Sequence, residues 1–183
     1  MSTAALAGVE SREDDAELVA RAQRGDRAAF AVLLEAHYER IYRLAYRWCG
    51  HREDAEDVAQ EVAIKLAGAL KGFDGRSAFT SWLYRIVLNA VRDRQRQGQR
   101  RMAQARALAL VAEDEAPPEQ EAGLEDAALW AAVRTLPDKQ REAVILVYAE
   151  DMSHAEAGTV MGIKEGTVSW YLAEARKTLR TVL

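Results

Sequence analysis

The residues with the clearest chemical potential lie between positions 73 and 96, where aromatic side chains are followed by arginines. Side chains at helical spacing form one polar stripe there: Ser81, Arg85, Asn89, Arg92 and Arg96. Guanidinium groups bind phosphates, and aromatic faces and forked hydrogen-bond donors bind unstacked bases. The stripe therefore predicts a nucleic-acid-binding helix face, and the alternative is an amphipathic core helix with an ordinary basic surface.

The preceding segment carries the opposite charge at the same spacing. Its outer stripe runs through Asp54, Asp57, Glu61 and Lys65, and Asp54 is the expected N-cap of the helix. An acidic face of this kind predicts a docking site for a basic partner, although an ordinary solvated face has the same composition.

A third motif near the C-terminus predicts a helix-turn-helix. Ser153 and Glu156 have the spacing of a capping box, and Gly162 is the expected turn before a second helix over residues 165–179. Ala157 and Gly158 are small where the two helices should cross. From Lys139 onward six basic residues balance six acids, so a structural two-helix hairpin stays open as the alternative.

No pattern in the chain indicates catalysis. The three histidines, His37, His51 and His154, lie in different segments, and no Walker loop, dinucleotide-binding glycine motif or nucleophile elbow is present. We therefore predict a protein that is not an enzyme, with no metal and no cofactor.

Composition agrees with an all-α protein in a reducing compartment. The chain has 183 residues, of which 49% are hydrophobic and 30% charged, with a net charge of −4 and three prolines. A single cysteine, Cys49, excludes an internal disulfide framework. Neither a signal peptide nor a stretch long enough to span a membrane is apparent, so we predict a cytoplasmic protein without membrane insertion.

The elements that position the motifs form two small helical domains joined by a flexible acidic linker. We predict a disordered N-terminus over residues 1–13, a first domain over 14–100, a linker over 101–123 and a second domain over 124–183. Between Glu113 and Asp126 there are seven acids and no basic residue, with Pro117 and Pro118 in the middle. In the second domain, Arg141 and Glu142 are expected on the exposed side of a helix that begins after Pro137.

The order of these motifs resembles the extracytoplasmic-function group of bacterial RNA polymerase sigma factors. The segment DAEDVAQEVAIKL resembles region 2.2, FDGRSAFTSWLYRIVLNAVRDRQR resembles regions 2.3 and 2.4, and the stretch from Leu136 to Arg180 resembles region 4. The resemblance implies a promoter-specificity subunit that binds core polymerase, recognises the −10 and −35 elements and promotes DNA melting. It also implies an anti-sigma factor as regulator.

The same resemblance assigns roles to individual residues. Contacts with the β′ clamp helices are expected at Asp54, Asp57, Gln60 and Glu61. Contacts with the −10 element are expected at Thr80, Ser81, Trp82, Arg85, Asn89, Arg92 and Arg96, with Asn89 near the pocket for an extruded base. Region 4 is expected to bind the β flap and to contact the −35 element through Ser153, Lys164, Glu165, Thr167, Ser169, Trp170, Tyr171, Glu174, Arg176 and Lys177.

Two departures from the family pattern lie in this last region. Ser169, Trp170 and Tyr171 stand where many relatives have basic or small residues, so the −35 preference is not transferable. Gly158 replaces a commoner alanine and is expected to loosen the supporting helix.

Two other functions remain alternatives from the sequence. A free-standing dimeric helix-turn-helix regulator would bind duplex DNA without polymerase. A helical adaptor would bind only proteins. The acidic face of residues 54, 57 and 61 and the aromatic segment have no role in the first of these alternatives.

Overall fold

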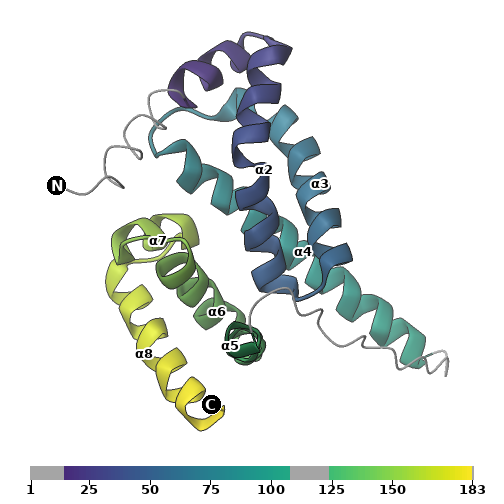
Figure 1. Cartoon of the computed structure of the whole chain (residues 1–183), viewed down its shortest axis with the longest axis vertical. Helices are drawn as coiled ribbons and strands as arrows, with labels where there is room; N and C mark the ends of the chain where they lie inside the picture. The colour runs from purple at the N-terminus through teal and green to yellow at the C-terminus, as the bar shows by residue number, and fades with distance from the viewer. Residues whose placement is uncertain (1–14, 108–123, 183) are drawn as a thin grey trace.

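A computed structural model of the chain describes residues 15–107 and 124–182, and within these ranges every regular element is a helix (Figure 1). The predicted all-α fold is therefore confirmed. The predictions for residues 1–13 and for the acidic segment over residues 108–123 lie outside the described residues.

Residues 15–107 form the N-terminal bundle, which begins with a short helix over residues 15–23. The next helix, α2 (Arg27–Cys49), has Asp26 as its N-cap, and the Asp26 carboxylate accepts hydrogen bonds from the backbone N–H groups of Ala28 and Ala29. Gly50 ends α2 in the left-handed conformation, at φ 80°. Both ends of α2 were predicted from these residues.

The third helix begins earlier than predicted. α3 (Arg52–Ala69) follows His51, which makes no side-chain capping bond, and the chain then forms a 3₁₀ turn, η1 (Leu70–Gly72). Asp54 is therefore not the N-cap of α3, because the helix has already begun two residues before it.

The bundle is closed by α4 (Phe79–Ala107), which packs across α2 and α3 and continues past them at its basic end (Figure 1). Leu33, Leu44, Leu66 and Leu83 are fully buried between these helices. Complete burial of one such side chain stabilises the fold by roughly 1.5–3 kcal/mol. The helix extends beyond residue 100, where the sequence predicted the linker to begin.

Residues 124–182 form the C-terminal bundle. α5 (Leu124–Arg134) ends before Pro137, and α6 (Asp138–Val144) follows and continues into a π-helical turn, η2 (Ile145–Ala149). α7 (His154–Met161) begins with the predicted capping box of Ser153 and Glu156, Gly162 forms the turn at φ 70°, and α8 (Glu165–Val182) follows. The predicted helix-turn-helix is thus present as α7, its turn and α8.

The two bundles lie against each other. The largest contacts between them join α4 to α7 and α2 to α5, and buried residues of both bundles form one continuous apolar cluster. Figure 1 shows the C-terminal bundle beside the N-terminal one. This arrangement determines which side chains of α4 are accessible.

Candidate nucleic-acid interface

The polar stripe predicted on α4 exists, but its members differ in exposure. Arg85, Asn89 and Arg96 are exposed, and Arg92 is half-buried. The Arg92 Nη1 group donates a hydrogen bond to Oδ1 of Asn89 at 3.2 Å, so these two side chains act as one unit on the helix surface. Ser81 departs from the prediction, because it lies in the first turn of α4 and its side chain is buried.

The aromatic residues before and at the start of α4 form a compact cluster. The ring centroids of Phe73 and Trp82 lie 5.0 Å apart, and those of Phe79 and Trp82 lie 5.9 Å apart. Trp82 is half-buried by these contacts. Its ring holds the N-terminal turn of α4 to the bundle and leaves part of its surface accessible.

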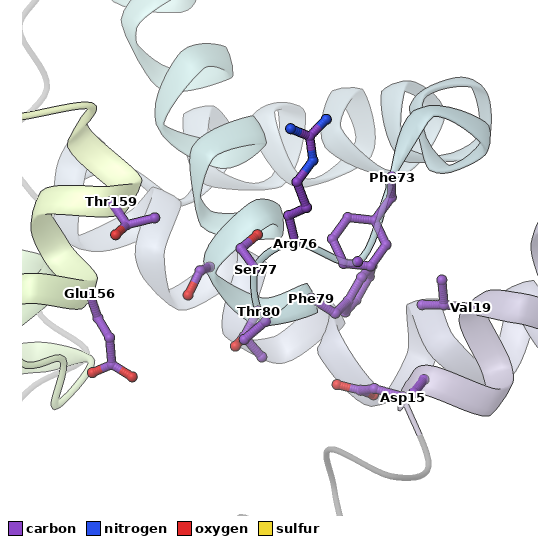
Figure 2. A pocket seen from close by; sticks show the side chains of 13 residues that line it. Asp15, Val19, Phe73, Arg76, Ser77, Phe79, Thr80, Glu156 and Thr159 are labelled. Carbon is purple, nitrogen blue, oxygen red and sulfur yellow. The ribbon is translucent and has the colours of Figure 1, made fainter.

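A cavity of about 480 Å³ lies beside this cluster (Figure 2). The loop before α4 and the first turn of α4 form one wall, with Ser77 and Thr80, and Asp15 and Val19 line another side. Glu156 and Thr159 of α7 lie across the cavity from Ser77 and Thr80. The cavity therefore lies between the start of α4, where −10 contacts are expected, and the helix-turn-helix.

Two arginines of the polar stripe are bonded to the C-terminal bundle. Nη2 of Arg85 donates to the backbone carbonyl of Thr159 at 2.7 Å. Nε of Arg92 donates to Oε1 of Glu142 at 2.6 Å, and Glu142 also accepts from Nζ of Lys139 at 3.2 Å. Glu142 is completely buried, and two partly exposed cations compensate its charge.

A second acid of the C-terminal bundle, Glu150, is bonded in the same way. Its side chain is 6% exposed, and it accepts from Arg47 at 2.5 Å and from the hydroxyl of Tyr84. Burial, followed by the Glu150 charge, raises the pKa of Tyr84, so the phenol keeps its proton and donates. Arg47 also donates to the Ala149 carbonyl at 3.1 Å and lies over the Trp130 ring.

The predicted acidic face on α3 is present, and it is partly neutralised within the bundle. Arg94 of α4 donates to Asp54 at 2.8 Å and to Asp57 at 2.6 Å, and Lys65 pairs with Glu61 at 2.6 Å. Gln60 is exposed beside them. Asp57 retains about half of its side-chain exposure, so a partner can still reach it.

On α8 the predicted outward residues are largely accessible. Lys164, Glu165, Ser169, Trp170, Glu174, Arg176 and Lys177 are found on the surface or partly so. Trp170 is 57% exposed and packs its ring against Tyr171, which is half-buried, as is Thr167. The Ser169 hydroxyl and Nδ1 of His154 share a hydrogen bond at 2.8 Å, which links α8 to α7.

A second cavity, of about 380 Å³, lies where Cys49 at the end of α2 meets the C-terminal bundle. Arg94 of α4 and Arg134 and Arg141 of the C-terminal bundle line it. Arg141 lies over the Trp48 ring, with its guanidinium carbon 4.7 Å from the ring centroid. Burial raises the pKa of the Cys49 thiol to about 12. Cys49 is therefore a protonated, half-buried thiol in this arrangement.

Several of these contacts were missed or wrongly predicted from the sequence. Arg141 and Glu142 were expected to be exposed, but the first is half-buried and the second fully buried. Their burial comes from the neighbouring bundle, since Arg92 is 50 positions from Glu142. A pattern within one helix contains no signal for such a contact.

Comparison with known proteins identifies both bundles. The family described as "Sigma-70 region 2" matches residues 33–101, and "Sigma-70, region 4" matches residues 126–179. The chain is 31% identical to the ECF RNA polymerase sigma factor SigW of Bacillus subtilis, over 90% of this chain and 94% of that protein. It is 34% identical to SigM of Mycobacterium tuberculosis, over 96% of this chain and 88% of that protein.

A solved structure has the same arrangement of helices. CnrH, in complex with the cytosolic domain of CnrY, is 28% identical and superimposes with a TM-score of 0.69 over 92% of this chain and 96% of CnrH. The fold and both matched regions define a sigma factor of the sigma-70 class. The chain belongs to the extracytoplasmic-function group of RNA polymerase sigma factors, which act in transcription initiation and are not enzymes.

This membership confirms the resemblance found in the sequence, and it sets aside a free-standing dimeric regulator and an adaptor that binds only proteins. Within the described residues, no helix is long and apolar enough to cross a membrane, and no cluster of three or more potential metal ligands occurs.

Proposed function

We propose that this sigma factor contacts the −10 element through α4 and the loop before it. The observation that supports this assignment is the polar stripe of exposed Arg85 and Asn89 and half-buried Arg92, which lies next to the partly accessible Trp82 and Thr80. Arginines on such a stripe bind the backbone, and a side-chain amide hydrogen-bonds the edge of a base. Binding of one extruded base offsets the few kcal/mol that unpairing costs.

Core polymerase binds the acidic face of α3 in this proposal. Asp57 and Glu61 lie on one side of the helix, with Gln60 beside them, and both acids keep part of their surface exposed. The partner would be the basic β′ clamp helices. The region 4 bundle would bind the β flap, and the domain boundaries at residues 100 and 124 belong to the same proposal.

The −35 element is read by α8. Lys164 immediately precedes the helix, its N-terminal half presents Ser169 and the flat ring of Trp170, and Arg176 and Lys177 lie further along. Recognition helices of helix-turn-helix proteins contact base edges with these N-terminal positions. A ring at position 170 favours apolar contact, such as that with a thymine methyl group, over contact with a phosphate.

Regulation by an anti-sigma factor, in the cytoplasm, completes the proposal. CnrH was solved with the cytosolic domain of CnrY, and the RpoE protein of Bartonella quintana was solved with the anti-sigma factor NepR. Support for this chain comes from its 28% identity to CnrH over nearly the whole length. We place the protein in the cytoplasm because its proposed partner, RNA polymerase, acts there.

A mobility-shift assay with and without core polymerase tests the proposal. Promoter fragments should shift strongly only when both the chain and core polymerase are present, and the mixture should give promoter-dependent transcripts. Tight binding of duplex DNA by the chain alone, with no effect of polymerase, would contradict it.

Two sets of variants separate the proposed roles. Asn89→Ala should reduce promoter opening roughly tenfold, about 1.4 kcal/mol, while core binding stays within twofold, because Asn89 is exposed on α4 and lies outside the acidic face of α3. Asp57→Asn with Glu61→Gln should weaken core binding and leave the helix content unchanged. Permanganate footprinting measures opening, and fluorescence anisotropy measures core binding.

Glu53→Gln with Glu56→Gln is the matched control for the acidic face. It removes the same number of charges from the same helix, on positions outside the proposed docking stripe. Equal loss of core affinity in both double variants would mean that general charge, and not the stripe, attracts the polymerase.

A further inference from the structure

Two arginines of the α4 stripe that the proposed function assigns to promoter DNA are bonded to the C-terminal bundle. Arg85 donates to the Thr159 carbonyl and Arg92 donates to the Glu142 carboxylate. Helix α7 also lies across the cavity from Thr80, as Figure 2 shows. The contacts therefore use the same donors that would bind promoter DNA.

The acceptors on the C-terminal bundle have the chemistry of a phosphate. A carboxylate and a carbonyl oxygen present lone pairs to guanidinium groups as phosphate oxygens do. Glu142 has no exposed surface, so removal of Arg92 would leave its charge with only Lys139. Arg92 cannot donate along the same N–H bonds to Glu142 and to DNA at once, which makes the two interactions mutually exclusive.

Glu150 holds the two bundles together at a second point. It accepts from Arg47 of α2 and Tyr84 of α4, two residues outside the proposed DNA and polymerase contacts. Its side chain is 6% exposed. Beside the apolar cluster, the packing of the bundles thus includes two buried carboxylates of the C-terminal bundle, each bonded to cations or donors of the N-terminal bundle.

We propose that the C-terminal bundle is an intramolecular inhibitor of the −10-binding face, held in place by Glu142 and Glu150. The role of α4 in DNA binding is taken from the proposed function, whereas the closed packing is independent of it. In the free chain the closed form engages donor groups of Arg85 and Arg92, although Arg85 stays exposed and Arg92 is half-buried. Promoter DNA and core polymerase then bind the open form, so whatever stabilises the closed form weakens their binding by the same factor.

The chain contains its own reporter of opening. Cys49 is the single cysteine of the sequence. It lies at the junction of the bundles, where Arg134 and Arg141 of the C-terminal bundle line the cavity around it. Separation of the bundles removes this cover, so the rate of reaction with a thiol reagent reports the open fraction.

The test uses two double variants. The interface pair carries Glu142→Gln and Glu150→Gln in one chain, and the control pair carries Glu39→Gln and Glu56→Gln. The control pair breaks two exposed ion pairs, Glu39–Arg43 and Arg52–Glu56, each within one helix of the N-terminal bundle. Two quantities are measured on the full chain: the rate of Cys49 modification and the affinity for a labelled random-sequence single-stranded DNA.

The interface pair should raise both quantities by about 5- to 150-fold, the usual range for coupling between two sites. The control pair should change each less than about twofold. A charge swap, Arg47→Glu with Glu150→Arg, should restore slow Cys49 modification that Glu150→Arg alone accelerates. If circular dichroism shows that the interface pair has lost helix content, the charge swap serves as the test instead.

Three results would overturn the inference. The first is a Cys49 rate in the interface pair no higher than in the control pair, since the bundles would then not be held by these carboxylates. The second is faster modification without tighter DNA binding, since the contact would then be packing without inhibition. The third is a swap that leaves Cys49 as reactive as in Glu150→Arg. Failure of the proposed function would appear separately, as absent promoter-dependent transcription with the thiol rates unaffected.

Discussion

Gly158 lies where α7 approaches the turn that precedes α8. A Cβ atom at this position would lie 2.8 Å from the backbone oxygen of Ile163, and Ile163 and Gly162 both donate to the Gly158 carbonyl. The sequence-based hypothesis that Gly158 loosens the supporting helix is therefore wrong. The missing side chain allows the close contact that fixes the turn of the helix-turn-helix.

Gly158→Ala should lower the free energy of unfolding by about 1–3 kcal/mol, the usual cost of forcing extra atoms into a packed contact. Urea denaturation measures it. Gly68→Ala is the matched control, because nothing lies within 4 Å of a Cβ at that position on α3. The control should stabilise by roughly 0.5–1 kcal/mol, since alanine favours a helix over glycine. If Gly158→Ala instead raised the free energy of unfolding as Gly68→Ala does, the contact with Ile163 would relax freely.

At the scale of the helix, the sequence predicted what depends on neighbours along the chain. Asp26 and Gly50 bound α2, and Ser153 and Glu156 begin α7, because a cap and its partner lie within three or four residues. The start of α3 was missed because His51 makes no capping bond, and Asp54 is used by Arg94, 40 positions away. Rules based on neighbours along the chain could not show that Asp54 pairs with Arg94 and does not cap the helix.

The capping bond of α2 should make stability depend on pH. The hydrogen bond from the Ala29 backbone, followed by that from Arg21, lowers the pKa of Asp26 below 3.8. The carboxylate therefore stabilises the fold above the unfolded-state pKa, and this stabilisation is lost as the pH falls through the lower folded-state pKa. Asp26→Asn should melt at a lower temperature than the wild type at neutral pH, and the difference should shrink toward about pH 2.

Thermal melts followed by circular dichroism at each pH measure the Asp26 difference. Glu35→Gln, an exposed change on the same helix that touches no cap bond, should alter the melts little. A difference for Asp26→Asn that stays constant down to acid pH would show that the cap does not depend on charge.

For the whole molecule, the helices, the polar stripe of α4, the acidic face of α3 and the helix-turn-helix were predictable, but their mutual arrangement was not. The positions of Arg92, Asn89 and Trp82 follow from a period of 3.6 residues, which is a property of one helix. The partners of Arg92 and Arg47 are 50 and 103 positions away. Only packing of the bundles brings them together, and a single helix pattern contains no information about that packing.

The shared interface should also make the chain unfold as one unit. Arg47 joins α2 to Glu150, to the Ala149 carbonyl and to the Trp130 ring. Arg47→Glu places a second acid beside the buried Glu150, and loss of one partner of a buried pair costs about 3–5 kcal/mol. Calorimetry of the wild type should show one transition, and Arg47→Glu should show two, because the bundles then no longer stabilise each other.

Arg43→Glu is the control for this experiment. It lies one turn away on α2, its side chain is 54% exposed, and its ion pair with Glu39 stays within the helix. A reversal there disturbs only a surface pair, worth less than about 1 kcal/mol, so one transition should remain, with a small shift. If both variants instead kept one transition with equal shifts, the bundles would be coupled through their apolar contacts, and Glu150 would not be needed to hold them together.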